Sequence, residues 1–116
     1  MIMKIRLTPT AAAQLKLISE TMTNKTGFIM GQDIGKFRII ENLLPVNFDE
    51  TNIDEVYARA FNRIGDKLIG VFFNHCEAFP SDWFIENTII KIKEPQPEFY
   101  LCDVNNKYTR LPEITI

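Results

Sequence analysis

Residues 53–73 have the sequence IDEVYARAFNRIGDKLIGVFF, and this stretch decides the fold class of the chain. Its first half carries apolar side chains at helical spacing, namely Ile53, Val56, Tyr57, Ala60, Phe61 and Ile64. This spacing predicts an amphipathic helix whose single apolar face belongs to the core. We expect Thr51 or Asn52 to cap the helix and Gly65 to end it.

The second half of this stretch, Leu68 to Phe73, is apolar throughout. A continuous apolar run of this length is typical of a strand that is covered on both faces. At the N-terminus, Met3, Ile5 and Leu7 alternate with charged residues and predict a half-buried strand. Thr8 is expected to cap a helix over residues 9–22, because proline at position 9 suits a first helical turn.

The remaining segments predict further strands. Residues 27–31 and 36–40 are expected to form a hairpin around a turn at 32–35, and Pro45 is expected at an edge or a strand end. Residues 88–93, 99–102, 108–111 and 114–116 favour strands, with a short helix at 83–87. The chain is therefore expected to be one α/β (more narrowly α+β) domain over residues 1–116, with a mixed sheet and two main helices packed on it.

Composition and charge limit the partners. The 116 residues are 46% hydrophobic and carry a formal net charge of −2, so we expect no binding to nucleic acid or anionic membranes. No apolar run is long enough to cross a bilayer, and the first residues do not resemble a secretory signal. We therefore expect a cytoplasmic protein whose cysteines, Cys76 and Cys102, are reduced.

The order of these elements resembles the JAMM/MPN domain. The resemblance rests on Gly27-x-x-x-Gly31, a turn at Gly35, Leu44-Pro45-Val46, an amphipathic helix, and Leu68-Ile69-Gly70-Val71-Phe72 followed by a loop with a histidine. It implies a cytidine-deaminase-like architecture. The family includes zinc-dependent isopeptidases that act on ubiquitin-like tails, and also non-catalytic scaffold members.

The family's metal motif is incomplete in this chain. The motif is His-x-His, then seven residues, Ser, two residues and Asp, with a general-base Glu before the first glycine strand. The first His falls on Phe73 and the second on His75. Counting onward places the Ser on Trp83 and the Asp on Glu86, while the general base falls near Asn24. A catalytic zinc needs three protein ligands, so the usual hydrolytic mechanism is not expected.

A shift of the loop would recruit Ser81 and Asp82 instead, without restoring the first His or the Glu. The candidates for a reduced metal or acid–base site are then His75 with Glu86 or Asp82, and zinc is the cofactor that such a site would hold. A His75 hydrogen-bonded to the loop backbone is the simpler interpretation. No cofactor is expected otherwise.

Cys76 is a candidate redox thiol or soft metal ligand, together with Cys102 if their strands lie close. An ordinary small buried residue is the alternative. Phe79, Trp83 and Phe84 indicate either a partner-binding surface or a cap on the core.

A second resemblance concerns the segment LTPTAAAQLK at residues 7–16, which is similar to the opening of A-type, HesB-like iron–sulfur carriers. Those proteins hold their cluster on three cysteines, two of them in a Cys-x-Cys near the C-terminus. Residues 109–116 contain no cysteine.

We therefore expect a non-catalytic JAMM/MPN-like domain that binds another protein, with residues 74–86 as the candidate binding loop. The alternatives are an iron–sulfur assembly accessory and an unusual metal- or thiol-dependent hydrolase centred on His75. An exposed edge strand would also allow two copies to pair into a homo-oligomer.

Overall fold

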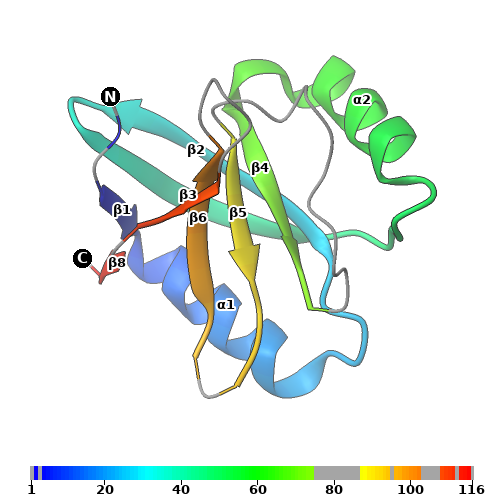
Figure 1. The fold of residues 1–116 in the computed structure, drawn as a ribbon, viewed down its shortest axis with the longest axis horizontal. Helices are drawn as coiled ribbons and strands as arrows, with labels where there is room; N and C mark the ends of the chain where they lie inside the picture. The colour runs from blue at the N-terminus through cyan, green and yellow to red at the C-terminus, as the bar shows by residue number, and fades with distance from the viewer. Residues whose placement is uncertain are drawn as a thin grey trace.

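The computed structural model describes residues 2, 4–74, 87–94, 96–102 and 108–111, together with the backbone of 113–115. The helices are α1 (Pro9–Thr21), α2 (Ile53–Ile64) and the short 3-10 helix η1 (Gly65–Lys67) (Figure 1). The strands are β1 (Lys4–Leu7), β2 (Gly27–Ile34), β3 (Phe37–Pro45), β4 (Leu68–Phe73), β5 (Thr88–Lys91), β6 (Glu98–Cys102), β7 (Tyr108–Arg110) and β8 (Glu113–Thr115).

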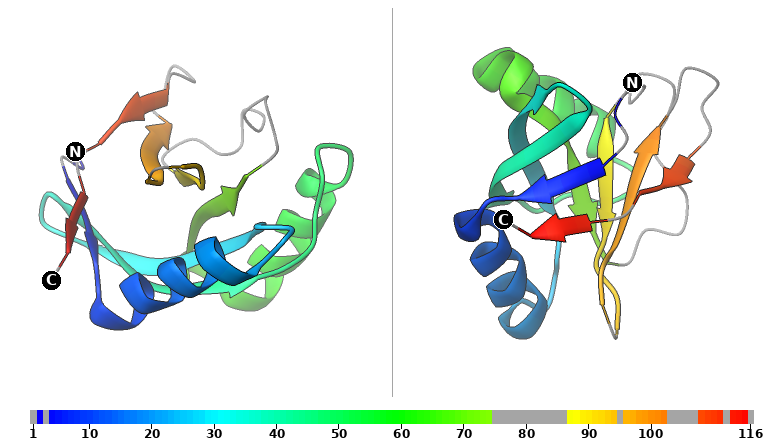
Figure 2. Two further views of the ribbon diagram at one scale, coloured as in Figure 1. Left: turned by 90° about the horizontal axis from the view of Figure 1, so that it is seen from below. Right: turned by 90° about the vertical axis from the view of Figure 1, so that its left-hand side faces the viewer.

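The described strands form one mixed sheet in the order β7-β6-β5-β4-β2-β3-β1-β8. β1 runs parallel to β3 and β8, and β4 runs parallel to β5, whereas the other neighbours are antiparallel. Figure 2 shows that the sheet is strongly curled, so that its β6–β7 end turns toward its β1–β8 end. The predicted α+β domain with a mixed sheet and two main helices is confirmed at this level.

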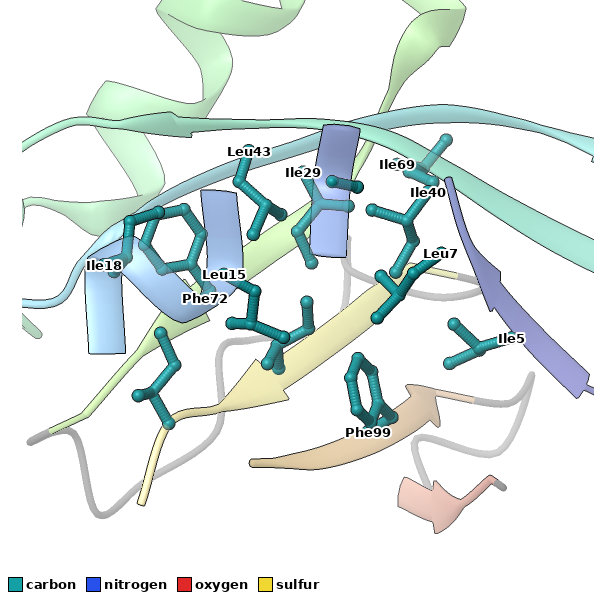
Figure 3. Packing of buried hydrophobic residues seen from close by; sticks show 13 residues of the cluster. Ile5, Leu7, Leu15, Ile18, Ile29, Ile40, Leu43, Ile69, Phe72 and Phe99 are labelled. Atoms are coloured by element: carbon teal, nitrogen blue, oxygen red, sulfur yellow. The ribbon is translucent and has the colours of Figure 1, made fainter. Parts of the chain in front are cut away.

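The helices lie on opposite faces of the sheet. α1 buries Ala11, Leu15 and Ile18 against residues from all six strands β1 to β6 (Figure 3). Because β1 and β6 are far apart in the strand order, side chains from both can meet only on the concave face. α2 packs on the other face through Ile53 and Tyr57, with Phe28, Val71 and Ile89 beneath them.

β4 takes part in both layers, which explains why its sequence is apolar throughout. All six of its residues are buried, with Phe72 in the α1 layer and Val71 and Phe73 in the α2 layer. The predicted strand with two covered faces is confirmed. Gly70 is required here, because a Cβ at this position would lie 1.8 Å from the carbonyl oxygen of Thr88 on β5.

The predicted hairpin is present, but its turn is shorter than expected. Ile34 pairs directly with Phe37, so the connection consists of Gly35 and Lys36 alone. Gly35 has a φ of 59°, the left-handed conformation that a two-residue hairpin turn favours. Pro45 ends β3, as expected for a residue that cannot donate to a ladder.

The start of α1 is as predicted. Thr8 Oγ1 accepts a hydrogen bond from Ala11 N–H over 3.1 Å, and proline at position 9 begins the helix. At the start of α2, Asn52 occupies the N-cap position, as one of the two predicted residues, but its side chain makes no capping hydrogen bond. Asp49 Oδ1 accepts from the N–H groups of Thr51 and Asn52, over 2.8 and 3.1 Å, and so stabilises the turn before the helix.

One member of the predicted α2 stripe was assigned wrongly to the core. Phe61 is 45% exposed, whereas Tyr57 is 2% exposed. Ala60 and Ile64 in the same part of the helix pack against the α2 layer, so Phe61 lies at the edge of the stripe, beyond the covered surface. Gly65, with a φ of 72°, ends the helix as predicted.

The C-terminal strands match the sequence prediction closely. β5, β6 and β7 lie within or beside the predicted ranges, and β8 pairs in parallel with β1. The predicted helix at 83–87 and the segment 103–107 lie outside the described residues, apart from Asn87.

Candidate functional site

The end of β4 is where the family resemblance places the first zinc ligand. Phe73 occupies this position and is 1% exposed, packed in the α2 layer with Phe28 and Tyr57. A phenyl ring offers no lone pair to a metal ion. Phe73 therefore fills a core position in place of a ligand.

The segment between α1 and β2 lies beside the end of β4. Lys25 N–H donates to Asn74 Oδ1 over 3.3 Å, and Asn74 Nδ2 donates to the carbonyl oxygen of Thr23 over 3.5 Å. Asn24, at the general-base position, donates from Nδ2 to Asn47 Oδ1 over 3.2 Å. An amide does not titrate near neutral pH, so Asn24 cannot take a proton from water.

The other residues predicted from the motif, namely His75, Cys76, Ser81, Asp82, Trp83 and Glu86, lie outside the described residues, as do Phe79 and Phe84. Cys102 is buried on β6, with its N–H donating to the carbonyl oxygen of Asn87 over 3.1 Å. In the described ranges, no three His, Cys, Asp or Glu side chains are grouped so that they could hold a metal ion.

A buried polar network, which the sequence analysis missed, lies near the start of β4 and β5. Arg38 on β3 is 6% exposed and forms a two-point ion pair with Asp33 on β2, with Nε–Oδ1 and NH2–Oδ2 distances of 2.8 and 2.9 Å. Its NH1 donates to Thr88 Oγ1 on β5 over 3.1 Å. The alternation of side chains along β3 could have predicted this burial, because Arg38 shares a face with the buried Ile40 and not with Phe37.

Tyr57 lies close to this network from the side of α2. Burial raises the pKa of its phenol to about 12, although a hydrogen bond with the Asn87 side chain and the positive charge of Arg38 both act to lower it. The phenol is therefore protonated throughout the physiological pH range. Tyr57 is suited to donating a hydrogen bond and not to accepting a proton.

A hollow of about 430 Å³ opens between β2, η1 and α2. Its walls include Gln32, Asp33, Arg38, Phe61, Asp66, Lys67 and Asn87. The charges in the wall balance, since two are acidic and two are basic. The hollow therefore offers an anchor point for a side chain more readily than a site for an ion.

No family model matches the chain, and the comparison with curated proteins gives no significant match. Within the described residues, no helix has both the length and the apolar character needed to cross a membrane.

Proposed function

We propose that this chain is a catalytically degenerate JAMM/MPN-like domain that acts by binding another protein. The observation that carries the proposal is the burial of Phe73 in the core, at the position where the resemblance requires the first zinc-binding histidine. A buried aromatic side chain there stabilises the domain, whereas an imidazole would be needed for hydrolysis.

The arrangement of the described elements supports the family placement. The segment that holds the general-base position lies against the end of β4, joined by the hydrogen bond from Lys25 to Asn74. Positions 24 and 73 are far apart in the sequence, and a zinc hydrolase of this family needs them at one site. This proximity supports the proposal, in which an amide and a phenyl ring stand in place of the functional groups.

The residues therefore do not fit a catalytic zinc site. Of the motif, only His75 and one carboxylate, Glu86 or Asp82, retain groups that bind zinc. Without hydrolysis, the function that remains within this class is that of a scaffold. Among the described residues, no observation favours the iron–sulfur or thiol-hydrolase alternatives.

The first experiment measures the metal content and hydrolytic activity of the protein purified without chelator or affinity tag, with His75→Ala beside it. We expect no stoichiometric zinc in either sample and no cleavage of an isopeptide-linked ubiquitin-like tail. Stoichiometric zinc that is lost in His75→Ala, together with cleavage by the unaltered protein, would contradict the proposal.

A gain-of-ligand variant tests the family placement separately. Phe73→His would place two imidazoles at positions 73 and 75, the spacing of the His-x-His motif, so we expect this variant to bind zinc through His75. Phe73→Leu is the control for the loss of core packing. A folded Phe73→His protein that binds zinc no better than Phe73→Leu would show that the motif has been placed on the wrong strand.

A further inference from the structure

The convex face of the β2–β3 hairpin and β1 is not covered by either helix among the described residues. The strand register places on this face Gln32 and Ile34 of β2, Phe37 and Ile39 of β3, and Lys4 and Arg6 of β1. Their neighbours Ile5, Arg38 and Ile40 point to the concave side and are buried. We call the six convex residues, together with Lys36 in the turn, the outer hairpin face (Figure 2).

This face has apolar side chains that remain accessible. Ile34 is 58% exposed, and Phe37 and Ile39 are half-buried. α2 covers the same side of the sheet further along, over Phe28 and Val71. A contiguous exposed apolar area on a sheet typically marks a binding surface, particularly where polar residues border it.

The border of this face is positively charged. Lys4 and Lys36 are exposed, and Arg6 lies with its guanidinium carbon 4.6 Å from the centre of the Phe37 ring. None of these three cations forms an ion pair within the described residues. The face is therefore basic although the whole chain has a net charge of −2.

The Arg6 side chain stacks on the Phe37 ring. Its Nε is buried and has no hydrogen-bond partner among the described residues, so the stack is the contact that positions the guanidinium. A planar guanidinium that is already positioned loses less entropy when it pairs with a carboxylate. Arginine and aromatic residues are also the types that dominate the energy of protein interfaces.

The hollow described above adjoins this face. Gln32 belongs to the outer hairpin face and also lines the hollow, whose walls include the exposed Phe61 and four charged residues. A partner that covers the face could place one polar side chain in the hollow. The surface thus combines accessible apolar side chains, a cationic border and an adjoining hollow.

We propose that the outer hairpin face is the docking surface for an acidic protein partner, one that presents apolar side chains flanked by Asp or Glu carboxylates. This inference rests on the proposed function, which implies that the ligand is a protein. The docking surface and the chemistry of the partner are what it adds. Charge complementarity supports this occupant, since Lys4, Arg6 and Lys36 form no ion pair with a carboxylate in the part of the chain that the structure describes.

Three other occupants fit the surface less well. A symmetric dimer through this face would bring the cations of one copy toward those of the other. Nucleic acid or an anionic membrane would use the charge but leave Ile34 and Ile39 without an apolar partner.

The test uses the full chain and a fluorescent short peptide in which Glu alternates with Phe and Ile. A matched peptide carries Lys in place of every Glu. We expect the acidic peptide to bind, and Arg6→Ala and Ile34→Ser each to weaken binding by about tenfold. Lys16→Ala, on α1 and on the opposite side of the sheet, is the matched control and should bind as the unaltered protein does.

Charge reversal makes the result specific. Lys4→Glu changes an exposed side chain and leaves the Arg6–Phe37 stack intact, so we expect this variant alone to weaken binding of the acidic peptide. The Lys4→Glu/Arg6→Glu protein also loses the stack, and we expect it to prefer the lysine peptide. Equal binding of the acidic peptide by all variants would overturn the proposal.

Three further measurements would also overturn it. The first is Arg6-dependent binding of a single-stranded oligonucleotide without binding of the acidic peptide. The second is Arg6-dependent binding of phosphatidylserine vesicles, again without binding of the peptide. The third is a concentration-dependent dimer that Ile34→Ser abolishes. Zinc-dependent hydrolysis in the earlier experiment would refute the proposed function alone, because peptide binding is read independently of metal and activity.

Discussion

Arg38 NH1 donates a hydrogen bond to Thr88 Oγ1 over 3.1 Å, although β3 and β5 are separated in the sheet by β2 and β4. The curl of the sheet brings the two side chains together on the concave side. Thr88 is 0% exposed, so this polar contact is made out of water, where an unsatisfied partner is costly. The guanidinium thus joins the hairpin to the C-terminal half of the sheet.

Asp33→Asn should lower the free energy of unfolding by about 1–3 kcal/mol. The change leaves the buried guanidinium of Arg38 without its carboxylate. The expected loss of stability is smaller than for a fully buried ion pair, because the Asp33 side chain is 43% exposed. Urea unfolding followed by circular dichroism measures the effect. Glu55→Gln removes the exposed pair with Arg59 and is the control, with an expected change of about 0.3–0.5 kcal/mol. Equal effects of the two variants would show that burial of the Arg38 pair does not matter.

Glu98→Gln should make stability less dependent on pH in the acid range. Glu98 accepts from Tyr100 Oη over 2.8 Å and lies 3.2 Å from Lys93 Nζ, and these contacts hold the pKa of its carboxyl below the ordinary value. A lowered pKa in the folded state means that the stabilisation is present above the ordinary glutamate pKa. It is lost as the pH falls through the pKa of the folded protein.

Urea midpoints between neutral pH and about pH 3 test this expectation. The unaltered protein should be more stable than Glu98→Gln at neutral pH, and the difference should shrink in acid. A difference that grows in acid would show that the sign of the pKa shift is wrong.

Phe61→Ser and Tyr57→Ala should differ strongly, although both positions belong to one helical stripe. Phe61 is 45% exposed and its replacement should change the free energy of unfolding by no more than about 0.5 kcal/mol. Tyr57 is 2% exposed and packs edge-on against Phe28, so its truncation should cost about 3–5 kcal/mol. Thermal unfolding of both variants provides the comparison, and similar losses would mean that Phe61 is covered in solution.

Asp49→Ala should cost about 0.5–2 kcal/mol, because its Oδ1 accepts from the N–H groups before α2. Thr51→Ala removes only the hydroxyl that donates to the same oxygen and should cost less. Chemical denaturation of the two variants measures the difference. A larger effect at Thr51 would favour a capping role for Thr51, one of the two residues that the sequence predicted.

The elements with strong local signals were predicted well. Thr8 and the proline after it predict the start of α1, and the uninterrupted apolar residues predict β4. Capping and burial on both faces can be predicted because each depends on residue types at consecutive positions. The turn of the hairpin was placed less accurately. Gln32 and Asp33 are turn-like residues, but the pairing of Asp33 with Arg38 keeps them in the strand.

The candidate site was predicted only in part. On the family resemblance, the sequence predicted that Phe73 and Asn24 stand at the positions of a zinc ligand and a general base, because a motif fixes positions along the chain. It did not identify the buried role of Arg38, since an arginine in an alternating strand normally points to solvent. It also gave no role to Arg6, whose stacking on Phe37 depends on the pairing of β1 with β3.

The sequence by itself determined the order and type of most elements and most of the apolar face of α2. These properties depend on residue type and on spacing along the chain. Only the tertiary structure decided which strands are neighbours, which polar groups are buried, and which part of the sheet neither helix covers. Those properties depend on the curl of the sheet, which brings together residues such as Arg38 and Thr88 that lie 50 positions apart in the chain.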